Sequence, residues 1–283
     1  MMESILGPTN NAVEEAPVRG ISIGALFERL RSQGRKAVVP YFTAGYPTLE
    51  TTLELIRAAD RAGANLIEIG VPFSDPLADG PSIQRASEAA LRAGVTTDSA
   101  LWLVERACAC VATPLALMTY YNTIYARGCV RFCADAAGAG ARCLIIPDLP
   151  PEEADELLAA AKSAGMGVTF LAAPTSTPTR LRLIDRRSTD FVYAVTVAGV
   201  TGARISVTPE TLAYLRSLKR RLHKPFIAGF GVSGVETARA LAGEADGVVI
   251  GSALMDAVRG ARQDLAVKTV ERLLSDIRRG LDA

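Results

Sequence analysis

Short apolar runs alternate with amphipathic stretches along most of this chain, and this alternation constrains the fold more than any other feature. Eight runs rich in β-branched residues recur, mostly separated by helical patterns. Such alternation predicts a parallel sheet, and no GxGxxG sequence follows the first run, which favours a closed barrel over a doubly wound sheet. The predicted strands are 37–43, 65–71, 114–120, 142–146, 167–171, 191–196, 225–228 and 247–250.

The helical patterns complete an α/β fold, a single (β/α)8 TIM barrel with an N-terminal helix and extra helices in its βα loops. The N-terminal helix is expected over 24–32, the extra helices over 82–92 and 98–111, and no helix is assigned between residues 120 and 142. The other predicted helices are 49–62, 152–164, 179–187, 209–222, 233–242 and 264–279. Residues 1–20 lack periodicity and are expected to be a loose leader, whereas residues 21–283 should form the barrel.

Composition excludes several classes of function. With 283 residues, 49% of them hydrophobic, the chain can bury a large core, and its net charge of +1 predicts neither nucleic-acid nor membrane-surface binding. The first 20 residues lack a basic segment followed by an apolar one, and no later apolar run reaches about 18 residues. We therefore expect a cytoplasmic protein without a membrane segment. The five cysteines show no zinc-type spacing and are expected to be reduced core thiols, with no metal. The only histidine, His223, is expected on the surface, which disfavours a Ser/His/Asp triad.

The stretch from Leu66 to Pro81, LIEIGVPFSDPLADGP, carries an acid inside a predicted strand. Glu68 shares a face with Leu66 and Gly70, where an unpaired carboxylate would cost several kcal/mol. It must therefore be paired, be neutral through a raised pKa, or be kept for function. A buried ion pair is the structural alternative, but the neighbouring predicted strands offer no Lys or Arg.

A second carboxylate, Asp79, follows in a loop rich in Pro and Gly, near the C-terminal end of the same strand. Two acids in such different surroundings can hold different pKa values, as acid and base catalysis requires. An ordinary turn aspartate remains the alternative.

Glycine-rich turns after the last two predicted strands indicate an anion site. Residues 228–233 read AGFGVS, and residues 251–254 read GSAL and open a short helix. Glycines let backbone N–H groups approach phosphate oxygens, and the helix N-terminus adds the positive end of its dipole. The loop 198–204, AGVTGAR, is expected to be either a lid over the substrate or a static connection.

Five motifs together resemble the α subunits of tryptophan synthase over residues 21–279. They are LIEIGVPFSDPLADGP, PYFTAGYP (40–47), IIPDLPPEE (145–153), GVTGAR (199–204) and GFGVS (229–233). The resemblance implies lyase chemistry, the cleavage of indole-3-glycerol phosphate to indole and glyceraldehyde 3-phosphate in tryptophan biosynthesis.

The resemblance also implies roles for individual residues. Glu68 and Asp79 would be catalytic. Substrate would contact Tyr41, Ile83, Met118, Tyr120, Tyr193, Thr201 and Phe230, and phosphate would contact Gly202, Gly231, Gly251 and Ser252. Tyr41 stands where some members have Phe, a change that the ring should tolerate.

Acid–base chemistry suffices for this reaction, so no cofactor is expected in this chain. Indole is a poor leaving group as a carbanion, so C3 of the ring must first be protonated. Asp79 would accept a hydrogen bond from the ring N–H, and Glu68 would transfer the protons. The resemblance implies a β subunit that carries pyridoxal phosphate, in an α2β2 assembly, docked on the loop with Asp75 and Pro76. Two alternatives stay open: a free-standing lyase that releases indole, and a catalytically idle barrel that activates a β subunit.

Overall fold

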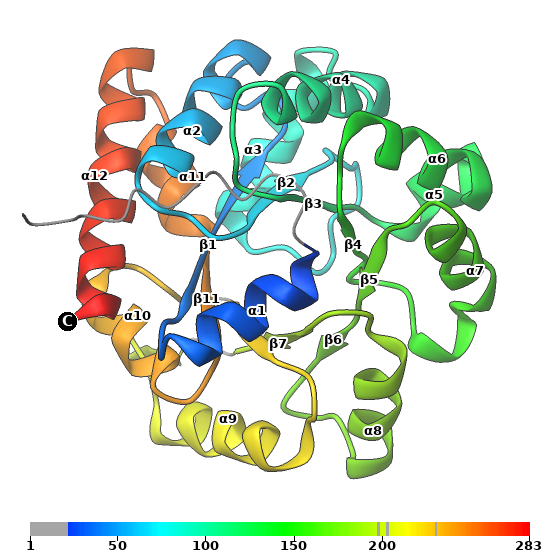
Figure 1. Ribbon diagram of the computed structural model, residues 1–283. Helices are drawn as coiled ribbons and strands as arrows, with labels where there is room; N and C mark the ends of the chain where they lie inside the picture. Colours follow the sequence, from blue (N-terminus) through cyan, green and yellow to red (C-terminus); the bar gives the residue numbers. More distant parts are fainter. Residues whose placement is uncertain (1–21, 197–198, 202–203, 230) are drawn as a thin grey trace, which may run out of the picture.

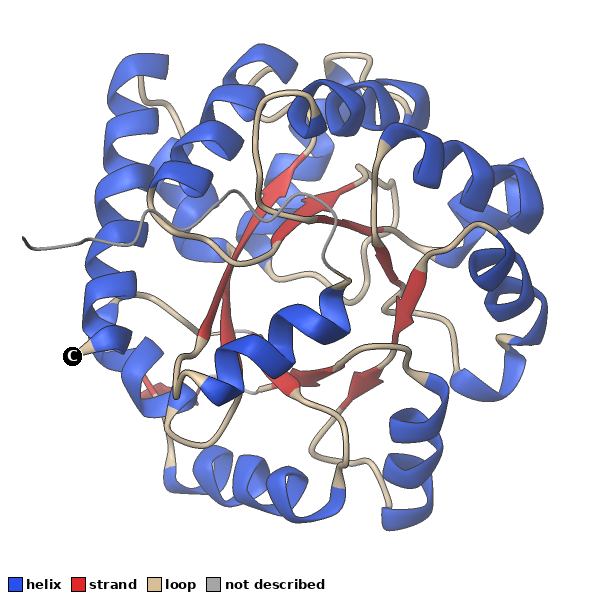
Figure 2. Cartoon of the chain, in the orientation of Figure 1, coloured by secondary structure: helices blue, strands red, loops and turns tan. Residues whose placement is uncertain are grey.

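The computed structural model describes residues 22–196, 199–201, 204–229 and 231–283, and it confirms the predicted barrel. One parallel sheet has the strand order β5-β4-β3-β2-β1-β11-β10-β7-β6 (Figure 2). Its strands are β1 (Ala37–Thr43), β2 (Ile67–Gly70), β3 (Leu115–Met118), β4 (Cys143–Ile145), β5 (Gly167–Thr169), β6 (Leu171–Ala172), β7 (Val192–Val195), β10 (Phe226–Gly229) and β11 (Gly247–Ile250).

The fifth predicted strand is divided in two, and this division closes the barrel. β5 pairs with β4, and β6 pairs with β7. Only Phe170 separates them, and its carbonyl accepts a hydrogen bond from the Tyr193 amide at 3.1 Å. Because β5 and β6 are consecutive, the two ends of the strand order meet.

Helices surround the sheet as an outer ring, except α1, which crosses one end of the barrel (Figure 1). They are α1 (Ile23–Ser32), α2 (Leu49–Arg61), α3 (Pro81–Arg92), α4 (Thr97–Cys108), α5 (Tyr121–Arg127), α6 (Cys129–Ala139), α7 (Asp155–Ser163), α8 (Pro178–Arg187), α9 (Pro209–Arg221), α10 (Val235–Ala242), α11 (Ser252–Val258) and α12 (Gln263–Asp282), with a 3₁₀ turn η1 (Pro151–Glu153). Several of these helices have a Ser or Thr at the N-cap whose hydroxyl oxygen accepts a hydrogen bond from a backbone amide of the first turn, as at Thr48 and Thr208.

Helix α1 covers the N-terminal end of the strands. The Gly24 amide donates to the Asp190 carboxylate at 3.1 Å, and the rings of Phe27 and Phe191 lie 5.3 Å apart, just before β7 begins. Phe27 and Phe191 are fully buried. Packed side chains therefore lie between α1 and the N-terminal end of the strands, and TIM barrels carry their ligand sites at the other end.

The assignment of no helix between residues 120 and 142 is wrong, because α5 and α6 lie there. Gly128, with a φ of 85°, separates the two helices, so neither is long enough to dominate the pattern. The signal in α6 was nevertheless present: its buried residues Cys129, Phe132, Cys133 and Ala136 follow helical spacing.

The segment predicted as a loop over 198–204 contains part of a hairpin. β8 (Gly199–Thr201) and β9 (Arg204–Ser206) pair antiparallel, with Thr201 opposite Arg204. Residues 197–198 and 202–203 lie outside the described part of the chain.

Surface features partly match the expectations. His223 is exposed, with 92% of its side-chain surface accessible, as predicted. Cys129, Cys133 and Cys143 are buried, but Cys108 is only half-buried and Cys110 is exposed, so the expectation of five core thiols is wrong for these two. In the described ranges, no helix is both long and apolar enough to cross a membrane.

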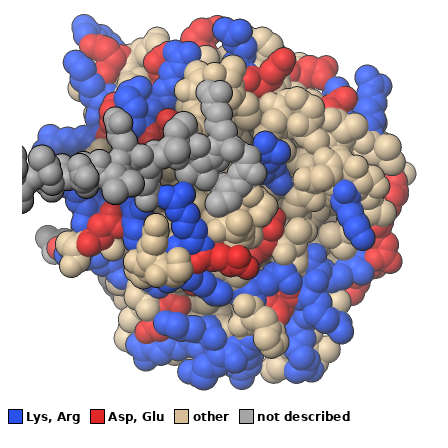
Figure 3. Space-filling view, in the orientation of Figure 1, with Lys and Arg blue, Asp and Glu red and all other residues tan. Residues whose placement is uncertain are grey.

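The small net charge is unevenly distributed. Figure 3 shows Lys and Arg side chains gathered over α8 and α9 on the face that α1 covers. The last turns of these helices carry Arg186 and Arg187, and Lys219, Arg220 and Arg221. Such residues suit the negative end of a helix dipole.

Candidate active site

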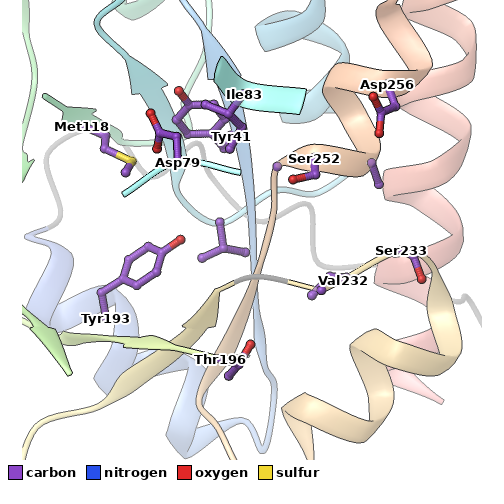
Figure 4. Close-up of a pocket in the computed structure, with 14 residues that line it drawn as sticks. Tyr41, Asp79, Ile83, Met118, Tyr193, Thr196, Val232, Ser233, Ser252 and Asp256 are labelled. Atoms are coloured by element: carbon purple, nitrogen blue, oxygen red, sulfur yellow. The ribbon is translucent and has the colours of Figure 1, made fainter. Parts of the chain in front are cut away.

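A cavity of about 500 Å³ opens at the C-terminal end of the strands, where the barrel fold commonly carries its chemistry. Its wall combines residues from β1, β3, β7 and β11 with residues from α3, α11 and the intervening loops (Figure 4). The lining residues are Tyr41, Asp79, Ile83, Met118, Tyr193, Thr196, Gly231, Val232, Ser233, Val249, Gly251, Ser252, Ala253 and Asp256.

Glu68 is completely buried in β2, level with Tyr41 on β1 and Ala116 on β3. Among the described residues, neither carboxylate oxygen has a hydrogen-bond partner, which argues against the buried ion pair. Burial raises the pKa of Glu68 from 4.5 to about 8, so the neutral acid predominates at pH 7. The side chain is not part of the cavity wall, but it is close enough to Tyr193 to contribute, after burial, to the raised pKa of that phenol.

Asp79 lies on the loop that joins β2 to α3, and it lines the cavity. Burial raises its pKa from 3.8 to about 6, while the Tyr120 hydroxyl partly offsets the rise. Its Oδ1 atom is buried without a hydrogen-bond partner in the described part of the chain. An acid in this environment is not an ordinary turn aspartate, and at pH 7 it is mostly ionised.

Contacts with Tyr120 and with α3 hold the Asp79 loop in place. The Ala78 amide donates to the Tyr120 hydroxyl at 2.9 Å, and the Phe73 ring stacks on the Tyr120 ring at 4.9 Å. The Asp79 amide donates to the Pro76 carbonyl at 3.0 Å, which closes a turn. Tyr120 therefore supports the loop through these contacts and is not one of the residues that line this cavity.

Two glycines that the sequence did not single out make room for the tyrosine rings. A Cβ atom at Gly70 would lie 2.0 Å from the Tyr41 hydroxyl, and one at Gly229 would lie 2.2 Å from the Tyr193 hydroxyl. The missing side chains let both rings cross the barrel interior beside Glu68. Their position at the ends of β2 and β10, in IEIG and FIAG, was the available signal.

Three of the four predicted phosphate residues lie in the wall of the cavity. Gly231, Gly251 and Ser252 all line it, and Gly251 caps the N-terminus of α11. Gly231 has a φ of 87°, which only glycine adopts readily. The first amides of a helix have no acceptor within the helix, so those of α11 are available to an anion.

The other predicted residues have different outcomes. Ile83 and Met118 line the cavity with Tyr41 and Tyr193. Thr201 belongs to β8, where only its backbone pairing is described. Gly202 and Phe230 lie outside the described residues. Asp75 is exposed and Pro76 half-buried, both on the Asp79 loop.

A second cavity of about 670 Å³ shares Met118 and Tyr193 with the first. Its wall is largely apolar near the shared residues, with Ile145, Leu171 and Val195. Sequence reasoning missed these three, although each is the last or next-to-last residue of a predicted strand. Within the described ranges, no group of three or more His, Cys, Asp or Glu side chains is arranged to hold a metal ion.

Comparisons with known proteins agree on one family. The sequence profile described as Tryptophan synthase alpha chain matches residues 27–279. The tryptophan synthase alpha chain of Geobacter sp. (strain M21) is 46% identical over 229 residues, which cover 81% of this chain and 86% of that protein. That of Geotalea uraniireducens (strain Rf4) is 43% identical over 261 residues, 92% of this chain and 98% of that protein.

Solved structures give the same result. Tryptophan synthase subunit alpha from Legionella pneumophila str. Paris superposes with a TM-score of 0.85 at 34% identity, covering 92% of this chain and 98% of that one. A structure of Mycobacterium tuberculosis tryptophan synthase gives a TM-score of 0.84 at 36% identity, with the same coverage.

The raised pKa of Glu68 predicts a specific pH dependence of stability. Between about pH 4.5 and pH 8, the unfolded chain has released a proton that folded Glu68 retains, so the free energy of unfolding falls as pH rises. The Glu68→Gln side chain does not titrate, so the variant lacks this pH dependence. We expect its free energy of unfolding, relative to wild type, to rise by up to about 1.4 kcal/mol per pH unit in this window. Urea denaturation at pH 5, 6, 7 and 8 measures the difference, and a constant difference would contradict a protonated Glu68.

Proposed function

The chain belongs to the tryptophan synthase alpha chain family, and we propose that Glu68 and Asp79 carry its reaction, the cleavage of indole-3-glycerol phosphate to indole and glyceraldehyde 3-phosphate. The protein is a carbon–carbon lyase of tryptophan biosynthesis. The observation that supports these two residues is a pair of carboxyl groups, one buried in β2 and one on the loop that follows β2, with different raised pKa values, about 8 and about 6. At pH 7 one is mainly a proton donor and the other mainly an acceptor.

The proposed mechanism uses each group in its prevailing state. Neutral Glu68 delivers a proton to C3 of the indole ring, which makes the ring nitrogen electron-poor and its proton acidic. Ionised Asp79 accepts a hydrogen bond from that N–H and stabilises the positive charge. Glu68 then removes the proton from the side-chain hydroxyl, and the carbon–carbon bond breaks in a retro-aldol step. Since Glu68 is outside the cavity wall, its side chain must rotate toward the substrate.

The proposed substrate orientation follows from the two ends of the cavity. The phosphate group would bind at Gly231, Gly251 and Ser252, together with Gly202. The indole ring would lie near Asp79, between apolar and aromatic side chains, where a flat ring excludes water. Those side chains are Tyr41, Ile83, Met118 and Tyr193, which line the cavity. The family resemblance adds Tyr120, Thr201 and Phe230 to the proposed substrate contacts.

We also propose a β subunit as partner, in an α2β2 assembly located in the cytoplasm. The docking loop would be the one with Asp75 and Pro76, whose neighbour Leu77 exposes 93% of its surface to solvent. An exposed leucine beside a catalytic carboxylate suits a site that a protein partner covers. Pyridoxal phosphate would belong to that partner, because the steps proposed for this chain need only proton transfer.

Removing the proton donor should abolish the lyase reaction. We expect Glu68→Gln to lower kcat by about 10²- to 10⁴-fold, because the amide fills the same space but transfers no proton. Asp79→Asn should also be severely impaired. Steady-state release of indole measures both, with Glu105→Gln on the surface of α4 as the control. More than about a tenth of wild-type activity in Glu68→Gln would reject the assignment.

A negative charge at the helix terminus should oppose phosphate binding. We expect Ser252→Asp to raise KM for indole-3-glycerol phosphate at least tenfold, since the carboxylate repels the phosphate and competes for the amides of α11. Ser252→Ala, which removes only a hydroxyl, should have a smaller effect. An unchanged KM in Ser252→Asp would mean that phosphate binds elsewhere.

Titration with a tryptophan synthase β subunit distinguishes the three possible functions. For the proposed function, we expect saturating β subunit to raise indole-3-glycerol phosphate cleavage by more than tenfold, because contact with the Asp75–Pro76 loop also orders Asp79. Pro76→Gly should weaken the stimulation by loosening the loop. High activity without stimulation or co-elution would indicate the free-standing lyase. Stimulation of the β subunit without any cleavage would indicate the idle barrel.

A further inference from the structure

We propose that Ser82, Arg85 and Asp256 couple the phosphate end of the cavity to Asp79, and thus act as positioning residues for the reaction. We call these three residues the α3–α11 clasp. The inference rests on the proposed function, because it concerns how the phosphate group and the indole ring of one substrate influence each other. No sequence motif pointed to this cluster, and only the fold brings its members together.

The clasp joins two helices that are far apart in the sequence. The Ser82 hydroxyl lies 2.8 and 2.9 Å from the two carboxylate oxygens of Asp256. The Arg85 guanidinium lies 3.2 Å from one of these oxygens and 2.9 Å from the Ser82 hydroxyl oxygen. Each member therefore contacts both others, which fixes the first turn of α3 against α11.

On the α11 side, the clasp continues directly from the proposed phosphate site. Asp256 follows Ser252 by four residues, so the two side chains lie on the same face of the helix. Both line the cavity, and Figure 4 shows them on one short helix. Ile83 of α3 packs beside the helix cap, with its Cδ1 atom 3.4 Å from where a Cβ of Gly251 would be. A phosphate that orders the start of α11 would therefore also order Asp256.

On the α3 side, the clasp is joined to the catalytic loop. Ser82 is three residues after Asp79, and Gly80 between them is the N-cap of α3. The Gln84 side chain donates to the Asp79 carbonyl at 3.0 Å and to the Pro76 carbonyl at 3.3 Å. The first turn of α3 and the Asp79 loop are thus one hydrogen-bonded unit. A shift of this turn would move the carboxylate that faces the indole ring.

The charges of the clasp explain how an acid can line an anion site. An isolated carboxylate at Asp256 would repel a phosphate at Ser252, but Arg85 and Ser82 neutralise and hold it. The side chains of Arg85 and Asp256 are about half exposed, at 48% and 47%, so their ion pair alone adds little stability. We therefore expect the main effect of the clasp on coupling between ligands rather than on folding.

The experiment measures that coupling with two ligands that undergo no reaction. Indole is titrated calorimetrically into the protein with and without saturating inorganic phosphate, and the ratio of the two Kd values gives the coupling factor. We expect phosphate to tighten indole binding about fivefold in the wild type, the lower end of typical couplings. In Asp256→Ala and in Ser82→Ala the factor should fall to about one, and Asp256→Asn should recover part of it because it retains an acceptor for Ser82.

The matched control is Glu88→Ala, which removes an acid of α3 that pairs with Arg92 within the same helix. This control should keep the wild-type coupling factor. A factor of one in the wild type, wild-type coupling in both clasp variants, or an equal loss in Glu88→Ala would overturn the inference. If Asp256→Ala does not fold, the Ser82→Ala result decides, since it removes only one hydroxyl.

Cleavage assays separate this inference from the proposed function. The clasp variants should lower kcat through a misplaced Asp79, whereas a loss of affinity for phosphate alone would raise only KM. Absence of indole-3-glycerol phosphate cleavage by the wild type would reject the proposed function. Normal cleavage with unchanged kcat and coupling in the clasp variants would reject the clasp alone.

Discussion

The desolvation of one carboxyl group is the constraint on which the proposed chemistry of this barrel depends. Glu68 occupies a strand that neighbours cover on both sides, and no described residue offers it a hydrogen bond. Ionisation there would cost several kcal/mol, so the protein keeps the acid neutral near pH 7. Gly70 and Gly229 leave room for the rings of Tyr41 and Tyr193, which are buried in the same barrel interior. Stability elsewhere in the core offsets the cost of burying an acid.

Most of the fold could be predicted from sequence because parallel strands and amphipathic helices have different periods. The prediction failed where a segment was divided or too short to show its period. Gly128 divides one helical stretch into α5 and α6, and Phe170 divides one strand between two neighbours. The hairpin of β8 and β9 was missed because a pairing of three residues on each side shows no alternation.

The two carboxylates could also be predicted, since an acid among β-branched residues and an acid in a Pro- and Gly-rich loop stand out locally. Their environment could not. The support of Asp79 by Tyr120, the niches at Gly70 and Gly229, and the contact of α3 with α11 all join residues distant in sequence. Such contacts depend on register and helix orientation, which no local pattern records. The roles of all the site residues stay predictions, and two of these residues, Gly202 and Phe230, lie outside the described chain.

The position of α1 across the N-terminal end of the barrel affects how substrate enters and products leave. The rings of Phe27 and Phe191 pack together at that end, and the two cavities that share Tyr193 open at the other. Two products must therefore depart by the path along which one substrate arrived. A sugar phosphate anchored at the rim would obstruct an aromatic product lying deeper, so the sequence of departures becomes a kinetic property of the barrel. A protein that covers the C-terminal opening of the barrel would therefore control the order and the direction of product release.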